Sequence, residues 1–279
     1  MKIATKKLKS EFGMPVYGIG TWHMGGTMMA DSSKDAQEVE AIKAALEQRV
    51  THIDTAEMYG NGHAEELVAQ AIKGRDRSKL FIVSKVWKTN LSYTDLLKAC
   101  KASLERLGTD YLDLYLVHAP NPSIPAEETI RALDELKEQG LIKEIGVSNF
   151  SVKQLKLAQK LSKNRIVTNQ IHYSLAYQDW QDVVDYCQEN DVLVTAYRPI
   201  ERGVLTQGGI AVLDQMSKKY NKTPAQIAIN WLIFQDNVVT LAKTSNPKHL
   251  RENLEALEFK MEKEDIKKLG KEFPQGLVT

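Results

Sequence analysis

The chain has 279 residues, and 43% of them are hydrophobic, which is enough to build a sizeable core. Its 37 basic and 36 acidic residues nearly balance, so no basic excess indicates nucleic-acid binding, and no basic amphipathic segment indicates a membrane surface. No apolar run is long enough to cross a bilayer, and the first residues lack the apolar part of a secretory signal peptide. Cys100 and Cys187 have neither disulfide nor metal-ligand spacing, which is typical of reduced thiols in a cytoplasmic protein.

Short apolar runs alternate with helical patterns along the chain. Eight runs rich in Val, Ile, Leu and Tyr lie near residues 16–21, 52–56, 80–86, 111–118, 142–148, 166–173, 192–198 and 238–243. Between them, helical periodicity is clear over residues 34–49, 94–108, 126–140 and 223–235. Gly108 and Gly140 suit the C-terminal ends of helices, and Thr223-Pro224 is typical of a helix start.

This alternation predicts parallel strands joined by crossover helices. An open doubly wound sheet fits the pattern too. The number of units, the length and the polar residues at the strand ends favour a closed (β/α)8 TIM barrel. We therefore expect one α/β domain over residues 1–279, with a short hairpin from residues 2–8 and 10–16 and an extra helix within residues 203–223.

Four polar residues, Asp54, Tyr59, Lys85 and His118, lie at or just past the ends of apolar runs. An acid, a phenol, an amine and an imidazole at successive strand ends suggest a proton-transfer site. Reduction of a carbonyl needs a hydride, which nicotinamide supplies, and a proton, which a protein acid must supply. Tyrosine is a poor acid because its pKa is near about 10.

A nearby ammonium lowers the pKa of a phenol, and Lys85 is the candidate for that charge. A buried lysine needs a counter-charge, which Asp54 can supply. His118 can donate a hydrogen bond to the substrate oxygen. Each residue alone has a simpler explanation: a structural ion pair for Asp54 and Lys85, a loop tyrosine for Tyr59, or a capped strand end for His118.

Other motifs are incomplete. Gly18-Ile19-Gly20 begins a dinucleotide fingerprint, but His23 stands where the third glycine belongs, so a Rossmann fold is rejected. No Walker A loop, H-E-x-x-H motif or paired His/Cys cluster is present, so no metal site is predicted. For His52, two residues before Asp54, we expect a structural role.

The strings DTAEMYGNG, SKVW, YLVHAP, GLIKEIGVSNF, TNQIHYS, TAYRP and KTSNPKHLRENL resemble the aldo-keto reductase family, in its order. The resemblance covers nearly the whole chain. It implies a TIM barrel whose bottom is closed by the N-terminal hairpin, and NADPH-dependent reduction of aldehydes and ketones. It also implies Tyr59 as the general acid, Lys85 and Asp54 as the pair that tunes it, and His118 as the orienting group.

The resemblance assigns cofactor contacts as well. Ser148, Asn149 and Gln170 would hydrogen-bond the nicotinamide carboxamide, and Tyr197 would stack on the nicotinamide ring. The simpler alternative is that Asn149 caps the following helix and Tyr197 belongs to the core.

The segment Lys243-Thr244-Ser245-Asn246 precedes a helix, and its backbone N–H groups and the lysine suit the 2′-phosphate of NADPH. Glu252 and Asn253 match adenine-contacting positions of the family. His249 stands where many members have an arginine, and a neutral imidazole cannot make the bidentate phosphate contact of a guanidinium. NADPH is therefore favoured, with NADH as an alternative. Arg198 and Arg202 would contact pyrophosphate or form ion pairs with Glu201.

Trp22, Met58 and Trp87, with His118, fall where the family lines its substrate pocket. The large rings favour apolar or aromatic carbonyl compounds. Ala119 replaces a frequent tryptophan, and the chain ends soon after its last helical segment, so we expect an open and permissive site. Two other functions stay open: a nicotinamide-binding regulatory subunit of the same fold, and a different barrel enzyme such as a phosphate-ester isomerase. The expected state is a monomer without nucleic-acid or membrane partners.

Overall fold

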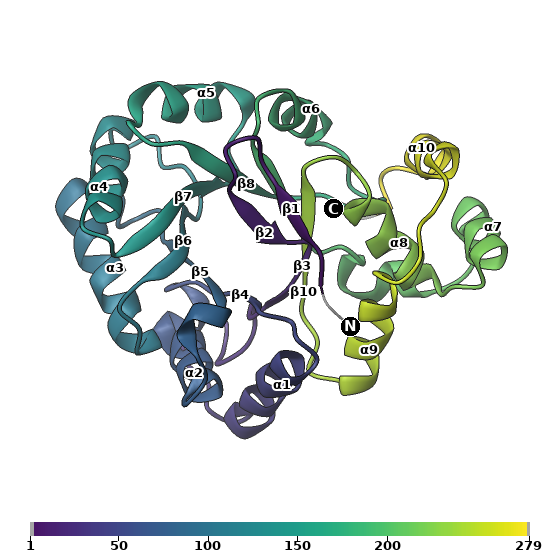
Figure 1. The fold of residues 1–279 in the computed structure, drawn as a ribbon, viewed down its shortest axis with the longest axis horizontal. Helices are drawn as coiled ribbons and strands as arrows, with labels where there is room; N and C mark the ends of the chain where they lie inside the picture. The colour runs from purple at the N-terminus through teal and green to yellow at the C-terminus, as the bar shows by residue number, and fades with distance from the viewer. Residues whose placement is uncertain (1–2, 278–279) are drawn as a thin grey trace.

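The computed structural model describes residues 3–277 and contains the expected closed barrel of eight parallel strands, hydrogen-bonded in the order β10-β3-β4-β5-β6-β7-β8-β9 (Figure 1). The barrel strands are β3 (Tyr17–Gly20), β4 (His52–Asp54), β5 (Phe81–Val86), β6 (Leu112–Val117), β7 (Ile142–Ser148), β8 (Ile166–His172), β9 (Leu193–Tyr197) and β10 (Val238–Ala242). Each lies within or next to one of the eight apolar runs. The TIM-barrel prediction is confirmed.

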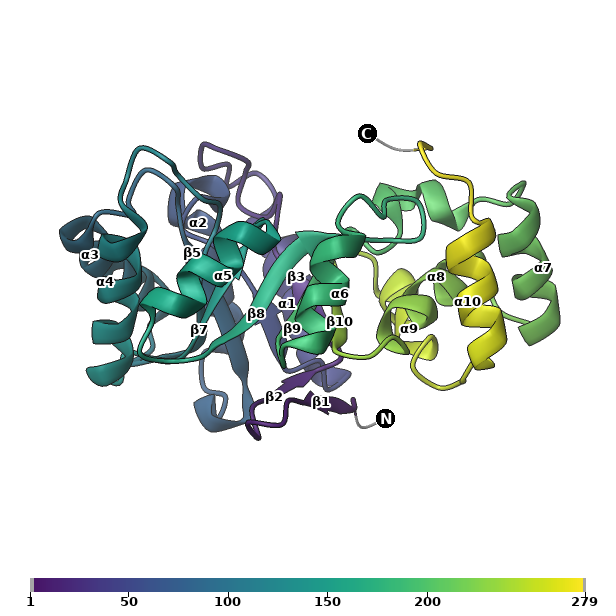
Figure 2. The same ribbon diagram turned by 90° about the horizontal axis from the view of Figure 1, so that it is seen from above.

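Helices surround the barrel in a ring, because each strand buries its outer face under the helix that follows it (Figure 1). They are α1 (Asp35–Glu47), α2 (His63–Ile72), α3 (Tyr93–Leu107), α4 (Ala126–Glu138), α5 (Val152–Leu161), α6 (Gln181–Glu189), α8 (Pro224–Ile233) and α9 (Pro247–Glu255). Two further helices, α7 (Ala211–Tyr220) and α10 (Lys263–Glu272), lie outside the ring beside α8 (Figure 2). The helix expected within residues 203–223 is α7.

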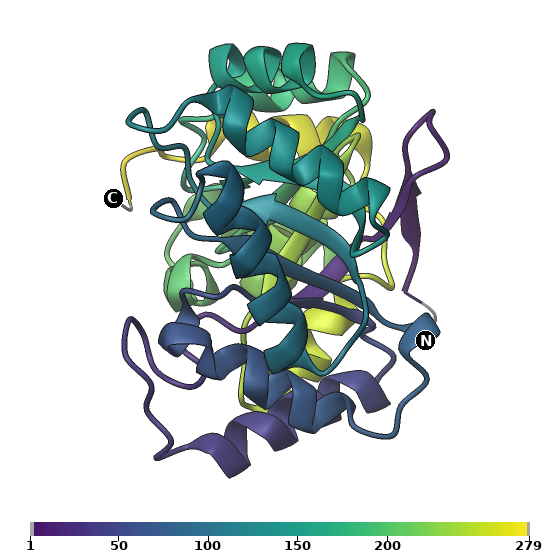
Figure 3. The same cartoon turned by 90° about the vertical axis from the view of Figure 1, so that its left-hand side faces the viewer.

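The N-terminal strands β1 (Thr5–Lys7) and β2 (Gly13–Pro15) pair as an antiparallel hairpin, which Figures 2 and 3 show across one end of the barrel. Leu8 and Met14 from this hairpin are buried against barrel-interior residues such as Val83 and Leu114. Burial of these apolar side chains seals the barrel at the end where the strands begin. The expected bottom closure is confirmed, and the opposite rim carries the polar strand ends.

The residues predicted to begin or end helices lie at the ends of the observed helices. Gly108 ends α3 in the left-handed conformation, with φ of 62°, which only glycine adopts without strain. Thr223 forms a capping box with Gln226, and Pro224 occupies the first turn of α8. Gly140 follows α4 with φ of 73°. None of the helices within residues 3–277 has the length and apolar character needed to cross a membrane.

Candidate active site

The closed barrel brings the four predicted strand-end residues to one rim. Asp54 is the last residue of β4, Lys85 lies near the end of β5, and His118 directly follows β6. Tyr59 begins the short 3₁₀ segment η1 (Tyr59–Gly62), five residues after Asp54. Parallel neighbouring strands end at the same level, so side chains that follow them share one pocket.

Lys85 is the centre of this group. Its Nζ donates hydrogen bonds to Asp54 Oδ1 at 2.6 Å, to the Thr55 carbonyl at 2.8 Å and to the Tyr59 hydroxyl at 3.3 Å. Lys85 is fully buried, and Asp54 and Tyr59 are only 3% and 7% exposed. A buried ammonium with three partners, one of them a carboxylate, is both neutralised and held in place.

Burial and charge compete in setting the pKa values of this group. Burial would lower the pKa of Lys85, but the neighbouring Asp54 and Tyr59 raise it above its ordinary value, so the amine stays charged. Burial raises the pKa of Tyr59, and the Lys85 charge opposes this without overcoming it. The expectation that Lys85 gives Tyr59 a net lowered pKa is therefore wrong for the protein without cofactor, because desolvation of the phenolate outweighs the ammonium.

His118 lies beside the phenol as a neutral ring. Burial, aided by the charge of Lys85, lowers the pKa of His118 to about 3. Its ring packs edge-on against Tyr59, with centroids 5.5 Å apart, and against Trp87 at 5.0 Å. Its Nδ1 is buried and has no hydrogen-bond partner among residues 3–277. A buried, unpaired nitrogen is costly unless a ligand completes it.

Gln170, predicted to contact nicotinamide, also contacts the catalytic group. Its Nε2 donates to Asp54 Oδ2 at 2.8 Å, and the side chain is buried. A carboxylate only accepts hydrogen bonds, so the amide nitrogen must face it, and the amide oxygen remains as an acceptor. Gln170 thus connects the predicted nicotinamide contacts to the Asp54 carboxylate.

The Asn149 side chain links the ends of three strands, β6, β7 and β9, and not the helix after it. Its Nδ2 donates to the carbonyl of His118 at 3.0 Å, and its Oδ1 accepts from the Tyr197 hydroxyl at 3.0 Å. Ser151 is the residue that caps α5, in a capping box with Gln154. The alternative role of Asn149 as a helix cap is therefore wrong. Tyr197 is half-buried at the end of β9 and not part of the buried core.

Ser148, the last residue of β7, lies beside Asn149 in the same network. It is buried, its hydroxyl donates to the Gln170 carbonyl at 2.9 Å, and it accepts from Asn149 Nδ2 at 3.0 Å. Ser148, Asn149 and Gln170, predicted together from two separate strings, thus form one connected group. Hydrogen-bonded amides of this kind have few alternative orientations.

Basic side chains gather beside this network. Among residues 3–277, Arg198, Arg202 and Lys243 form no ion pair. Glu201 is buried and binds His172 instead, so the predicted alternative of Arg198 or Arg202 ion pairs with Glu201 is wrong. Unpaired cations at a pocket rim fit an anion such as a pyrophosphate.

His23 is a member of this basic group that the sequence analysis missed. Burial lowers the pKa of His23, and the charges of Lys243, Arg202 and Arg198 lower it further, which places all three cations near the ring. Its position directly after Trp22, one of the predicted pocket residues, was the available signal. The sequence analysis considered His23 only as the residue that breaks a glycine motif.

The start of α9 has the expected exposed polar character. The Asn246 side chain caps the helix by accepting from the Lys248 N–H at 2.9 Å, and Thr244 Oγ1 accepts from the Asn246 N–H at 3.1 Å. Ser245 and His249 are exposed, and Glu252 is half-buried. Asn253 is different, because its side chain is buried and faces the Tyr17 hydroxyl at 3.4 Å.

Aromatic side chains lie beside the predicted catalytic group. Trp22 lies 4.9 Å from the Tyr59 ring, and Met58 packs on the same small cluster. Glu57, which the sequence analysis missed, joins two of the rim loops by accepting from the Trp87 N–H at 2.5 Å and from Asn90 Nδ2 at 3.0 Å. Its place in the string between Asp54 and Tyr59 was the signal for it.

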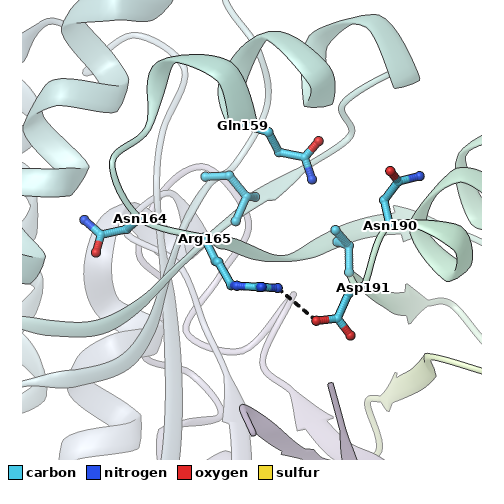
Figure 4. A pocket seen from close by; sticks show the side chains of 7 residues that line it. Gln159, Asn164, Arg165, Asn190 and Asp191 are labelled. Carbon is cyan, nitrogen blue, oxygen red and sulfur yellow. Dashed lines mark hydrogen bonds and ion pairs between the residues drawn. The ribbon is translucent and has the colours of Figure 1, made fainter. Parts of the chain in front are cut away.

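A separate hollow of about 190 Å³ lies at the other end of the barrel, where β8 and β9 begin (Figure 4). Arg165 and Asp191 form an ion pair of 2.9 Å in its wall, and Asp191 also binds the hairpin backbone at Lys9. None of the predicted catalytic residues lines it. Within residues 3–277, no group of three or more His, Cys, Asp or Glu side chains is placed to hold a metal ion.

Comparison with known proteins identifies the family to which this chain belongs. The model of the Aldo/keto reductase family matches residues 17–271. Methylglyoxal reductase YeaE of Escherichia coli is 36% identical over 273 residues, covering 96% of this chain and 94% of that protein. Glyoxal reductase of Bacillus subtilis is 35% identical over 267 residues, covering 95% of this chain and 91% of that protein.

Solved structures agree. A thermostable aldo-keto reductase in complex with the inhibitor epalrestat superposes with a TM-score of 0.92 at 43% identity, covering 97% of this chain and 100% of the other. An aldo/keto reductase from Klebsiella pneumoniae in complex with NADP and acetate gives 0.87 at 33% identity, covering 100% of this chain and 98% of the other. The chain therefore belongs to the aldo/keto reductase family and is an NAD(P)H-dependent oxidoreductase of carbonyl compounds.

Proposed function

We propose that the protein reduces small aldehydes and ketones with NADPH and that Tyr59 donates the proton to the carbonyl oxygen. The observation that carries this proposal is the position of Lys85, whose ammonium touches both the Asp54 carboxylate and the Tyr59 hydroxyl at the barrel rim. A structural ion pair would not need the third contact, to the phenol. Comparison with relatives named as reductases favours turnover over the regulatory alternative.

The residues around the rim fit a nicotinamide dinucleotide. The free amide oxygen of Gln170 and the half-buried Tyr197 ring suit the carboxamide and ring of nicotinamide. Arg198, Arg202 and Lys243, which have no acidic partner among the described residues, suit its phosphates. When bound, the reduced nicotinamide supplies the hydride.

In the proposed mechanism the protein binds the carbonyl oxygen between Tyr59 and His118. The neutral imidazole of His118 donates an N–H bond to that oxygen and orients it. Tyr59 releases its hydroxyl proton to the oxygen as negative charge develops there. The Lys85 ammonium then stabilises the phenolate, and Asp54 keeps Lys85 charged and aimed at Tyr59.

For the substrate we propose 2-oxoaldehydes, the class to which methylglyoxal and glyoxal belong. The relatives named methylglyoxal reductase and glyoxal reductase support this class. Trp22 packs beside Tyr59 and Trp87 beside His118, so the proposed proton donor and orienting group are flanked by aromatic rings that suit a compact carbonyl compound. We further propose that the protein acts as a monomer, as expected from the sequence.

The proposal is tested by following NADPH absorbance with methylglyoxal, glyoxal and simple aldehydes, and repeating the series with NADH. The expected result is turnover with both dicarbonyls and a preference for NADPH. His249→Arg should strengthen that preference by about tenfold, because a guanidinium can hold the 2′-phosphate with two hydrogen bonds. Absence of turnover with both cofactors across the whole series would contradict the proposal.

A further inference from the structure

Three aromatic rings from successive parts of the chain are stacked next to the predicted nicotinamide contacts. His172, the last residue of β8, lies parallel to Tyr177 with ring centroids 4.0 Å apart and planes 9° apart. On its other side it lies parallel to Tyr197, its cross-strand neighbour on β9, at 5.5 Å and 11°. Tyr197 is the end ring of this row, and the Arg198 guanidinium carbon lies 5.8 Å from its centroid, so the ring also joins the stack to the neighbouring basic side chains.

A buried carboxylate fixes the middle ring of this stack. Glu201 is 5% exposed, and its two carboxylate oxygens lie 2.9 and 3.0 Å from His172 Nε2. A carboxylate only accepts hydrogen bonds, so the N–H group at Nε2 of His172 is the donor in its hydrogen bonds to Glu201. Ser174 donates its hydroxyl to the same carboxylate. The imidazole is thus held in its plane by Glu201 and by the two tyrosine rings.

The same carboxylate holds the loop that follows β9. Arg198, Glu201 and Arg202 all have positive φ angles, of 59°, 47° and 54°, which non-glycine residues rarely adopt. Such a backbone persists only where other contacts hold it, and the buried side chain of Glu201 supplies one from within the loop. Arg198 and Arg202 flank Glu201 in the sequence, so the anchored loop carries two of the three cations whose charge acts on His23.

We propose that His172 and Glu201 are positioning residues for the nicotinamide cofactor. Through the stack they fix the plane of Tyr197, and through the loop they fix the positions of Arg198 and Arg202. The stacking face and the phosphate-binding cations are then set in advance by one buried hydrogen-bonded pair, which lowers the cost of ordering them on binding. This inference rests on the proposed function, because it assigns a new role within the same site.

The chain contains a matched control for this pair. Asp134 is a buried carboxylate on α4 that also holds a loop, since it accepts from Ser162 Oγ at 2.7 Å, the Lys163 N–H at 3.0 Å and Asn164 Nδ2 at 2.9 Å. That loop precedes β8 at the end of the barrel away from the catalytic rim. Asp134→Ala removes the same kind of anchor without touching the proposed cofactor contacts.

The experiment compares Glu201→Ala, Glu201→Gln and Asp134→Ala with the wild type by NADPH titration of protein fluorescence, single-turnover hydride transfer and Tm. Glu201→Ala should raise the Kd for NADPH by at least about tenfold, while Glu201→Gln, which keeps an acceptor for His172, should stay within about threefold of the wild type. Asp134→Ala should lower Tm and leave the Kd unchanged.

If Glu201→Ala does not fold, His172→Gln keeps a donor for Glu201 and removes the middle ring. It should slow hydride transfer at saturating NADPH by about tenfold, because Tyr197 loses its neighbour in the stack. If the wild type binds NADPH, and the Glu201 and His172 variants have the same Kd and the same rate of hydride transfer as the wild type, this inference alone is overturned. A wild-type protein that binds neither NADPH nor NADH would overturn the proposed function, and the inference with it.

Discussion

The side-chain amide of Gln170 donates to Oδ2 of Asp54 at 2.8 Å, while Lys85 occupies Oδ1 of the same carboxylate. The two residues are 116 positions apart in sequence and come from β8 and β4, on different sides of the barrel. A residue predicted to bind nicotinamide is thus bonded to the residue that keeps Lys85 charged. A substitution at either Gln170 or Asp54 should therefore alter the function of the other residue.

Gln170→Glu tests this coupling through pH. A second carboxylate beside Asp54 adds negative charge, which raises the pKa of Tyr59 and makes it a weaker acid. We expect kcat to fall by at least about tenfold at neutral pH and to recover as the pH falls and one carboxyl takes up a proton. Gln215→Glu, on the outer helix α7, is the control and should behave like the wild type. A loss independent of pH would contradict the coupling.

Variants at Lys85 distinguish its contribution to catalysis from its contribution to the stability of the fold. Lys85→Met leaves the buried Asp54 without its cation and should cost about 3–5 kcal/mol of unfolding free energy, together with a loss of kcat of about 10²–10⁴-fold. The double variant Asp54→Asn/Lys85→Met removes both charges, so it should recover most of the stability and none of the activity. Lys98→Met, at an exposed site on α3, serves as the control for urea unfolding and turnover. Recovery of activity in the double variant would rule out Lys85 as the tuning charge.

His118 should act in one protonation state across the usual assay range. Its pKa is lowered to about 3 by burial and by Lys85, so the ring stays neutral well below neutral pH. We expect the kcat/KM profile for reduction to show no step near about pH 6.5 that belongs to His118. His118→Gln keeps a donor and should lower kcat/KM at every pH by the same factor. A step that disappears only in His118→Gln would contradict a permanently neutral ring.

His52 makes the fold sensitive to acid. The ring is fully buried against Phe81, and neither nitrogen has a hydrogen-bond partner among residues 3–277. Burial lowers the pKa of His52 from 6.5 to about 4. The unfolded chain therefore binds more protons in this interval, so stability is complete above about pH 6.5 and is lost as the pH falls toward 4, at about 1.4 kcal/mol per pH unit.

His52→Leu removes both the titration and the two unpaired nitrogens. We expect the unfolding free energy at neutral pH to rise by about 1–3 kcal/mol and its acid dependence to become shallower by the slope that His52 contributes. Urea unfolding at several pH values measures both quantities. An unchanged acid slope would show that His52 does not titrate in this interval.

The arrangement of the barrel was predictable because strands and helices leave local signals. Residues 192–198 were expected as a strand, and β9 occupies Leu193–Tyr197 within them. Thr223 and Gly108 mark helix ends through their own side chain or lack of one, so no distant partner is needed to recognise them. The meeting of Asp54, Tyr59, Lys85 and His118 at one rim was predictable because each lies at or just past the end of an apolar run, and parallel strands deliver such residues to one rim.

What the sequence did not predict depends on distant partners and on burial. Ion pairs between Glu201 and the arginines next to it were one of two alternatives, but folding brings Glu201 to His172, 29 positions earlier. The sequence suggests that Lys85 lowers the pKa of Tyr59, yet the extent of burial decides the direction, and burial is a property of the whole fold. His23 and Glu57 were missed because their roles arise from neighbours on other loops.

Tyr59→Phe provides the most direct test of the proposed mechanism. This variant removes the hydroxyl that Lys85 contacts at 3.3 Å and keeps the ring that packs on Trp22 and His118. With NADPH and methylglyoxal we predict a loss of kcat of at least about 10²–10⁴-fold, with the Kd for NADPH unchanged. A variant that binds NADPH normally and still reduces methylglyoxal at the wild-type rate would contradict the assignment of Tyr59 as the proton donor.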